Sequence, residues 1–348
     1  MAKICIAIPT WNRSEKLLKC VESIASQIIE NNLDVSIFIS DNYSDDNTSE
    51  ICKILKNKYK FVDYIVRNEH GGVFDNLADV TDKAEGDYIW WFGDDDIMLA
   101  GGLKLILNNL NDDELAYICA GNASLMPQSN NIISGTVLDL CNHFGWNQIL
   151  GWISSDIIRN DIAKSICKLL KTEPYKLDAY AHVGAILTVA ANKKALLIDM
   201  PICRPMGNQE KEDLDRWQKE NIGWRYFLLI DTFKYMFDKG ILVNKFKPKF
   251  FQYLNYYIWD RFIINMISSE IRDSNFPEKG WSNILLISEM IDDLEVRKNI
   301  RIKSELVRML CNDRKVLIES IKKNEQRLLG VANESSQPVL NFNKMLKK

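Results

Sequence analysis

Residues 88–98 read YIWWFGDDDIM, an apolar run that ends directly on Asp94, Asp95 and Asp96. Adjacent carboxylates repel one another and lose hydration beside a buried strand, so this arrangement is costly unless a cation neutralises it. The stretch therefore predicts a buried strand that delivers acidic side chains to a divalent metal ion. An exposed acidic turn is the alternative, because charged runs commonly form solvated surfaces.

Around this stretch, short apolar runs alternate with helical patterns, which is typical of strand-helix-strand units around a largely parallel sheet. The predicted strands are KICIAIP (3–9), VSIFIS (35–40), FVDYIVR (61–67) and DYIWWFG (87–93). Helices are predicted at 14–28 and 73–84, and Asn47 with Glu50 three residues later predicts the capped start of another. The pattern indicates an α/β fold with a Rossmann-like, mostly parallel sheet.

All four predicted strands end in polar residues, in the segments TWNR (10–13), SDNYSDD (40–46), NEHGG (68–72) and DDD (94–96). Ligands of open α/β sheets bind at the carboxyl ends of the strands, so these four ends predict one site. The glycine motifs of dehydrogenases and P-loop enzymes are absent after the first strand, which argues against both classes. We instead expect a nucleotide whose base is read by side chains.

Asp41 is the candidate for reading the base, because its carboxylate can accept a hydrogen bond from uracil N3–H or from the cytosine amino group. UDP and CDP therefore both remain open. The alternative for Asp41 is an Asx turn or a helix cap, the interpretation we prefer for Asp45 and Asp46. A metal ion at Asp94 and Asp96 would hold the diphosphate.

These residues resemble family 2 glycosyltransferases with the GT-A fold, in the bacterial branch that builds surface polysaccharides. The resemblance covers roughly residues 3–110 and rests on four motifs in order, IAIPTWNR (6–13), IFISDNYSDDNT (37–48), RNEHGGVFDN (67–76) and GDYIWWFGDDD (86–96). Four ordered motifs are far more specific than any one of them.

The resemblance implies transfer of a sugar from a nucleoside diphosphate donor to a glycan or lipid-linked glycan, with inversion at the anomeric carbon. It implies that Asp94 to Asp96 are a D-x-D motif that binds Mn²⁺ or Mg²⁺ and, with Asp95, the diphosphate. By the same resemblance Asp41 reads the base. The remaining implied residues line the nucleotide pocket (Pro9, Thr10, Asn12, Arg13) or close over the nucleoside (Asn68, Gly71, Gly72).

The sequence departs from the family pattern at the general base. Relatives usually carry a Glu-Asp pair before a helix, whereas this chain has Ala181-His182. An imidazole with an ordinary pKa near 6.5 suits a base at neutral pH, so His182 is the candidate. Asp178, one helical turn earlier, could act instead or could orient His182. The alternative is a histidine that is simply hydrogen-bonded in the domain interior.

Composition bounds the remaining expectations. The 348 residues are 47% hydrophobic and 26% charged, with a net charge of -3 that gives no general attraction to nucleic acid. The eight cysteines are far apart, so we expect reduced, buried thiols. Without a signal-like N-terminus or a membrane-length apolar run, we expect a cytoplasmic protein, peripheral on the inner face of the membrane if it binds lipid.

We predict a GT-A domain over residues 1–210, divided into a nucleotide-binding half (1–110) and an acceptor half (111–210), followed by a helical region (211–348). The segment HFGWNQILGWISSDIIRN (143–160) is aromatic enough to stack on acceptor sugars, although Trp146 reads as core. Two rival functions are a sugar nucleotidyltransferase, which would need a glycine-rich loop after the first strand, and a non-catalytic sugar-nucleotide-binding scaffold protein.

Residues 297–348, the basic tail, contain thirteen Lys and Arg against five Asp and Glu, a net +8. An apolar stripe of Leu310, Leu317, Ile321 and Leu328 runs through this segment. A basic amphipathic helix can lie on an anionic membrane surface, where a lipid-linked acceptor would be found. The alternatives are packing against the catalytic domain and a homo-oligomer contact.

Overall fold

The computed structural model describes residues 4–122, 129–172 and 180–207, and a few further positions (232–233, 235–238, 240, 246–247, 285, 289–295, 297–298 and 301). Contacts divide the chain into two units, residues 1–209 and 210–348. Nearly all described residues belong to the first unit. The helices predicted beyond residue 210 and the basic tail fall almost entirely outside the described residues. No described helix is long and apolar enough to cross a membrane.

The strands of the first unit form one sheet whose order is β3-β2-β1-β4-β8-β6-β9-β5, with β7 also paired to β9. They are β1 (Ile4–Thr10), β2 (Val35–Asp41), β3 (Val62–Val66), β4 (Tyr88–Trp91), β5 (Asp96–Met98), β6 (Tyr117–Asn122), β7 (Ile132–Thr136), β8 (Asp156–Arg159) and β9 (Lys194–Pro205). The β1 to β4 pairings are all parallel. Antiparallel pairings involve β8, β7 and β5, so the sheet is mixed.

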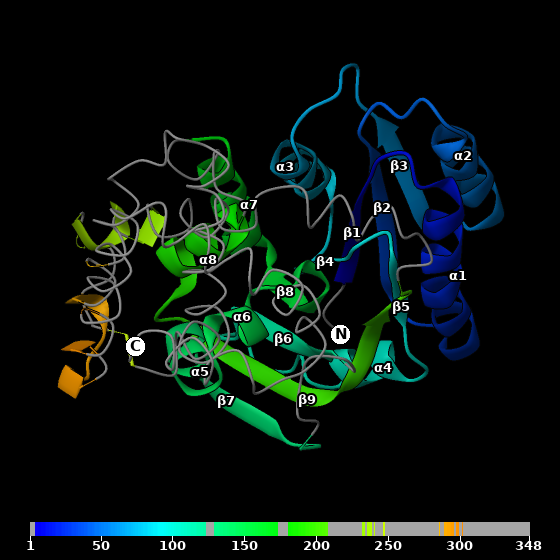
Figure 1. Cartoon of the computed structure of the whole chain (residues 1–348). Coiled ribbons are helices and arrows are strands. Elements are labelled where there is room, and N and C mark those ends of the chain that lie inside the picture. Colours follow the sequence, from blue (N-terminus) through cyan, green and yellow to red (C-terminus); the bar gives the residue numbers. More distant parts are fainter. Residues whose placement is uncertain are drawn as a thin grey trace, which may run out of the picture. The chain divides into compact units, whose positions relative to one another are not determined.

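The helices are α1 (Ser14–Asn31), α2 (Thr48–Lys58), α3 (Val73–Lys83), α4 (Gly102–Leu107), α5 (Val137–Phe144), α6 (Trp146–Ile149), α7 (Asn160–Leu170) and α8 (Ala181–Ala190), with a 3₁₀ turn η1 (Ile153–Ser155). Figure 1 shows α1 and α2 on one side of strands β1 to β3 and α3 on the other. Helix α1 buries the predicted stripe of Leu17, Val21, Ile24 and Ile28 against the sheet. The four predicted strands and the two predicted helices are thus confirmed to within a few residues.

The predicted cap of α2 is wrong in one detail. The helix begins at Thr48 with Asn47 at the N-cap position, but the Asn47 side chain makes no capping bond. Asp46 supplies the oxygen instead, because Asp46 Oδ1 accepts a hydrogen bond from the backbone N–H of Thr48 over 2.8 Å. The neighbouring carboxylate therefore satisfies the first free N–H of the helix, which is not the N–H that an Asn47 cap would bind.

Strand β4 lies in the middle of the sheet and brings the acidic triad to its carboxyl edge. Trp90 and Trp91 are fully buried and each indole N–H has a partner. Trp90 Nε1 donates to the carbonyl of Ser154 over 2.9 Å, and Trp91 Nε1 donates to Thr81 Oγ1 over 2.8 Å. Seven of the eight cysteines are in the described part, and all seven are buried free thiols, as expected.

Candidate functional site

The acidic triad follows β4 and meets the end of β1. Asp94 is 4% exposed, and its Oδ2 accepts a hydrogen bond from Thr10 Oγ1 over 2.7 Å. Arg13 Nη1 lies 2.7 Å from Asp94 Oδ1 and 3.0 Å from Asp95 Oδ2. Two predicted site residues of the TWNR segment therefore contact the predicted metal motif directly, across more than eighty residues of sequence.

The third carboxylate, Asp96, has its partner in a different segment of the chain, the η1 turn. Asp96 is 2% exposed and its Oδ2 accepts a hydrogen bond from Ser154 Oγ in the η1 turn. The same Ser154 Oγ accepts a hydrogen bond from the backbone N–H of Gly93 over 2.8 Å. The sequence analysis did not single out Ser154, and no local pattern marks it, because its role depends on β8 lying beside β4.

Burial dominates the electrostatics of the triad. Desolvation raises the pKa of the Asp94 carboxyl, and Asp95 adds to the effect while Arg13 opposes it. Desolvation also raises the pKa of Asp96 to about 8, against the opposing hydrogen bond from Ser154. A carboxyl group with such a pKa retains its proton at neutral pH unless a further cation balances its charge. One arginine does not fully compensate three adjacent carboxylates.

The donor set fits a hard divalent cation bound in an open site. No three carboxylate, imidazole or thiol groups of the described residues form a complete metal cage. Mg²⁺ and similar ions are commonly held by one or two carboxylates together with substrate phosphates, so a cage is not required. Each carboxylate oxygen has two lone pairs, and Asp94 and Asp96 can therefore bind a cation while keeping their present hydrogen bonds.

Asp41 is fully buried at the end of β2, and both of its oxygens have partners. Oδ1 accepts hydrogen bonds from the backbone N–H of Ser44, over 3.1 Å, and from the Ser44 hydroxyl. Oδ2 accepts one from the Ser49 hydroxyl. This is the turn geometry that the sequence analysis gave as the alternative for Asp41. Reading a base would require a spare lone pair on one of these oxygens, so that role stays a prediction.

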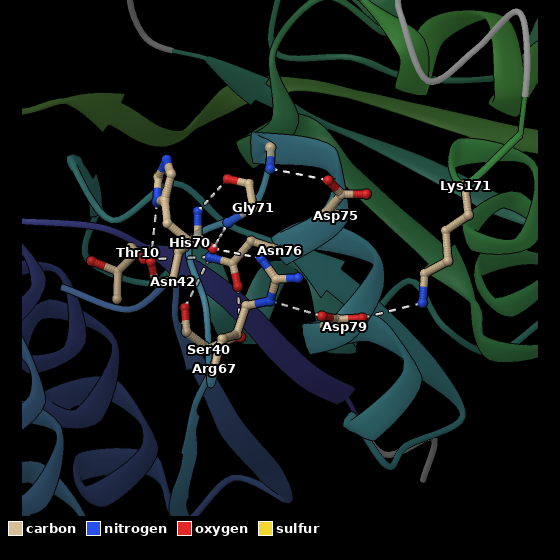
Figure 2. Close-up of polar contacts among 11 residues, drawn as sticks. Thr10, Ser40, Asn42, Arg67, His70, Gly71, Asp75, Asn76, Asp79 and Lys171 are labelled. Atoms are coloured by element: carbon tan, nitrogen blue, oxygen red, sulfur yellow. Dashed lines mark hydrogen bonds and ion pairs between the residues drawn. The ribbon is translucent and has the colours of Figure 1, made fainter.

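Asn42, next to Asp41, fixes the loop between β3 and α3 (Figure 2). Its Oδ1 accepts hydrogen bonds from Arg67 Nη1 over 2.6 Å and from the Gly71 backbone N–H over 3.0 Å. Its Nδ2 donates to the Gly71 carbonyl over 2.8 Å. The loop predicted to close over the nucleoside is thus attached to the end of β2 by one buried amide.

Arg67 extends this attachment to two helices. Arg67 Nε donates to Asp79 Oδ2 in α3 over 2.9 Å, and Lys171, just after α7, lies 3.1 Å from Asp79 Oδ1 (Figure 2). A Cβ atom at residue 71 would lie only 2.1 Å from Arg67 Nη1, so a larger residue would displace the guanidinium from its present contacts. A chain of polar contacts therefore links the strand ends to the far side of α3.

Asn76 also joins strand ends, in this case those of β1 and β2. It is 3% exposed, its Oδ1 accepts a hydrogen bond from Ser40 Oγ over 2.6 Å, and its Nδ2 donates to the carbonyls of Ser40 and Thr10 over 3.0 and 3.3 Å. Asn42, Arg67 and Asn76 were all missed by the sequence analysis. All three lie inside the motifs IFISDNYSDDNT (37–48) and RNEHGGVFDN (67–76), which is the signal that could have found them.

His182 is buried on α8. Its Nε2 lies 2.9 Å from the Leu150 carbonyl, so Nε2 carries the hydrogen and Nδ1 is the free lone pair. Nδ1 is buried and has no hydrogen-bond partner in the described structure, and the Phe74 ring stacks on the imidazole at 5.5 Å. Burial lowers the pKa of His182 to about 4, against the opposing Leu150 bond. Asp178 lies outside the described residues.

The remaining predicted residues lie along the same edge. Asn12 has a positive φ of 51°, and its Oδ1 accepts a hydrogen bond from the Asp45 backbone N–H over 2.9 Å. The Gly72 backbone N–H donates to Asp75 Oδ2 at the start of α3, over 3.0 Å. Pro9 pairs in register with Ser40, and Asn68 is exposed. The structure therefore gathers the nucleotide-side residues at one edge, with His182 on a separate helix.

A comparison with known families agrees with this geometry. Residues 5–140 match the family model described as glycosyl transferase family 2. The match confirms, over this part of the chain, the resemblance drawn from the four motifs.

Curated relatives are similar over about a third of the chain. The abequosyltransferase RfbV of Salmonella typhimurium is 37% identical over 117 residues, which are 33% of this chain and 35% of that protein. The GalNAc(5)-diNAcBac-PP-undecaprenol beta-1,3-glucosyltransferase of Campylobacter jejuni is 29% identical over 113 residues, 32% of this chain and 36% of that protein. The matched segments thus span about a third of the length of these relatives.

Among solved structures, S. aureus TarS 1–349 in complex with UDP gives a TM-score of 0.60 at 14% sequence identity, covering 92% of each chain. TarS 1–349 alone gives a TM-score of 0.56 at 13% identity, covering 93% of this chain and 92% of that one. These likenesses confirm the predicted α/β GT-A fold.

The Asn42 attachment predicts a local effect that hydrogen exchange can measure. Replacing Asn42 with Ala removes three hydrogen bonds from the loop and leaves the Gly71 N–H without its acceptor, which typically costs about 1 to 3 kcal/mol. We expect faster amide exchange at residues 67–72 and a lower melting temperature. The matched control is Asn47→Ala, an exposed asparagine in the preceding loop. Equal exchange in both variants would contradict the attachment.

Proposed function

We propose that this protein is a metal-dependent glycosyltransferase that moves a sugar from a nucleoside diphosphate to a glycan or lipid-linked glycan in surface polysaccharide assembly. The observation that carries the proposal is the acidic triad that follows the central strand, in which Asp94 and Asp96 are buried and Arg13 binds Asp94 and Asp95. An arginine beside carboxylates that can hold a cation is suited to a diphosphate, because both positive groups face the same anion.

On the donor side, Asp94 and Asp96 would hold Mn²⁺ or Mg²⁺ and Asp95 would complete the diphosphate site. When bound, the cation stabilises the negative charge that develops on the leaving diphosphate. Thr10 and Arg13 orient the Asp94 carboxylate through their hydrogen bonds. Asn42 and Arg67 keep the loop at residues 67–72 against the end of β2, where the nucleoside would lie.

For the acceptor, His182 is the proposed general base. Its Nδ1 lone pair is not used by any hydrogen bond in the described structure, and a base needs that lone pair to take the proton of an acceptor hydroxyl. The lowered pKa keeps the imidazole neutral at physiological pH, although it also makes the group a weaker base than an ordinary histidine. Asp178 is the alternative base, or the group that orients His182.

The donor and the acceptor classes follow from chemistry and from the relatives. UDP and CDP both offer a pyrimidine donor group to Asp41, and the neighbouring TarS structure contains UDP. A lipid-linked acceptor is supported by the printed name of the C. jejuni relative, which specifies an undecaprenol carrier. Inversion at the anomeric carbon is the expected stereochemistry. A thermal-shift panel of UDP-, CDP-, GDP- and dTDP-sugars with and without Mn²⁺ would identify the nucleotide.

A non-catalytic sugar-nucleotide-binding protein is the second candidate function. It is favoured by the burial of His182, which is 3% exposed and stands where the family resemblance implies an aspartate base. Slow hydrolysis of a donor sugar in the presence of Mn²⁺ separates the two candidates, since a binding protein should release no free sugar.

The metal proposal predicts that transfer requires a divalent ion. Asp96→Ala should abolish donor turnover, because it removes a carboxylate from the cation and the diphosphate loses its counter-charge. The measurement is transfer of labelled sugar with Mn²⁺, with Mg²⁺ and with excess EDTA. Circular dichroism and the melting temperature check that the variant is folded. Full activity of the unaltered protein in excess EDTA would refute the metal requirement.

The His182 proposal predicts a kinetic effect. His182→Ala should lower kcat by about 10²- to 10⁴-fold and leave donor affinity nearly unchanged, since a base acts on the acceptor. The exposed His143, changed to Ala, is the matched control. An unaltered kcat in the His182→Ala protein would transfer the role to Asp178.

The burial of His182 changes the pH profile that is expected for a histidine base. An ordinary imidazole would make the rate rise through about pH 6 to 7. With a pKa of about 4, His182 should support a rate that is flat from neutral pH down to about pH 5 and falls below it. The unfolded chain binds this proton near pH 6.5 and the folded chain only near pH 4, so folding stability also falls as the pH is lowered between these values. Melting temperatures at each pH separate the two effects.

For the basic tail, we propose attraction to anionic lipid, which would bring the enzyme to a lipid-linked acceptor. Removing residues 297–348 should reduce sedimentation with phosphatidylglycerol vesicles, and binding of the full chain should weaken as salt is raised, because screening acts beyond about 10 Å at 0.1 M. Neutral phosphatidylcholine vesicles are the control. Equal vesicle binding by both chains would instead assign the tail to packing or to a homo-oligomer contact.

A further inference from the structure

We propose that Ser154 is a positioning residue for the metal site, holding the Asp96 carboxylate in the orientation that binds the cation. This inference rests on the proposed function, because it takes Asp96 as a metal ligand. It adds a residue from outside the four motifs and outside the segment matched by the family model, which ends at residue 140.

Ser154 is fully buried and its backbone is fixed from two sides. Its carbonyl accepts a hydrogen bond from Trp90 Nε1 over 2.9 Å and a weaker one from Cys203 Sγ over 3.6 Å. These two donors come from β4, which leads into the acidic turn, and from β9, which pairs with β5 on the other side of the turn. The hydroxyl therefore projects from a rigid support rather than from a freely moving loop.

The hydrogen bonds of the hydroxyl have a defined direction. The Gly93 backbone N–H donates to Ser154 Oγ over 2.8 Å, so it uses one lone pair of that oxygen. Asp96 in its ionised form, the form that binds a cation, can only accept, so the hydroxyl hydrogen is directed to Asp96 Oδ2. This hydrogen bond holds Oδ2 of Asp96 and restricts rotation of the carboxylate, and it leaves Oδ1 as the oxygen for the cation.

The space around this contact is tight. A Cβ atom at Gly93 would lie 2.8 Å from Asp96 Oδ2 and 3.3 Å from Ser154 Oγ. Gly93 therefore allows the serine hydroxyl and the carboxylate to meet above the turn. Partners of metal-ligating side chains typically change metal affinity by about 10- to 100-fold when removed, which is the effect expected here.

The test measures metal binding directly. Free Mn²⁺ is quantified by its electron paramagnetic resonance signal during titration of the full chain in the presence of UDP. Ser154→Ala should raise the Kd for Mn²⁺ by about 10-fold or more, while the binding of UDP in EDTA stays unchanged. The alanine keeps the backbone carbonyl that Trp90 and Cys203 contact. Ser155→Ala is the matched control, a buried serine in the same turn that makes neither hydroxyl contact with the acidic turn.

Two further variants keep the result interpretable. Ser154→Cys fills the same space with a much weaker donor, and should also weaken Mn²⁺ binding without creating a cavity. Gly93→Ala should do so by separating the hydroxyl from the carboxylate. Melting temperatures identify any variant that does not fold, and such a variant is replaced by the other two in the comparison.

Asp96→Ala separates this inference from the proposed function. If Asp96→Ala loses Mn²⁺ binding but the folded Ser154 variants retain the wild-type Kd, Ser154 is only a structural partner of Gly93 and the inference is overturned. If Asp96→Ala itself leaves the Kd for Mn²⁺ unchanged, the metal assignment of the proposed function fails and this inference fails with it. Weakening in Asp96→Ala and in the folded Ser154 variants, but not in Ser155→Ala, supports both.

Discussion

Keeping three carboxylates at the end of a buried strand is the constraint on which the rest of this site depends. Burial disfavours the charged form of these carboxylates. The chain offsets this cost with hydrogen bonds from Arg13, Thr10 and Ser154, which come from different parts of the sequence. Because these partners must converge on one turn, β1, β4 and η1 have little freedom to shift relative to one another. The order of the central strands, β1-β4-β8, brings these partners to the same turn.

The second principle of the site is that strand ends are joined by buried amides instead of by apolar packing. Asn42 attaches the β3–α3 loop, and Asn76 joins the ends of β1 and β2. A buried amide left without partners would be unfavourable, so each of them specifies one arrangement of the polar edge. Such an edge can remain ordered while its exposed side faces a polar ligand, which suits a site for a sugar nucleotide.

The sequence predicted what depends on local pattern. Alternating apolar periodicity located β1 to β4, α1 and α3, and the four polar strand ends located the edge where Arg13 meets Asp94. It could not reveal Ser154 or the lowered pKa of His182, because both arise from segments brought together only by folding. The capping bond predicted for Asn47 was wrong, since the Asn47 side chain makes none and the Asp46 carboxylate accepts from the Thr48 N–H instead.

The pairing of β5 with the end of β9 has a consequence for the order in which the molecule is made. Asp96 pairs with Pro205, and Ser154 lies between them in sequence, so the acidic turn is completed by residues that leave the ribosome long after it does. During synthesis the triad therefore lacks these partners until the later strands of the sheet have formed. A cation and donor that bind only the complete site would then stabilise only chains whose sheet has fully formed.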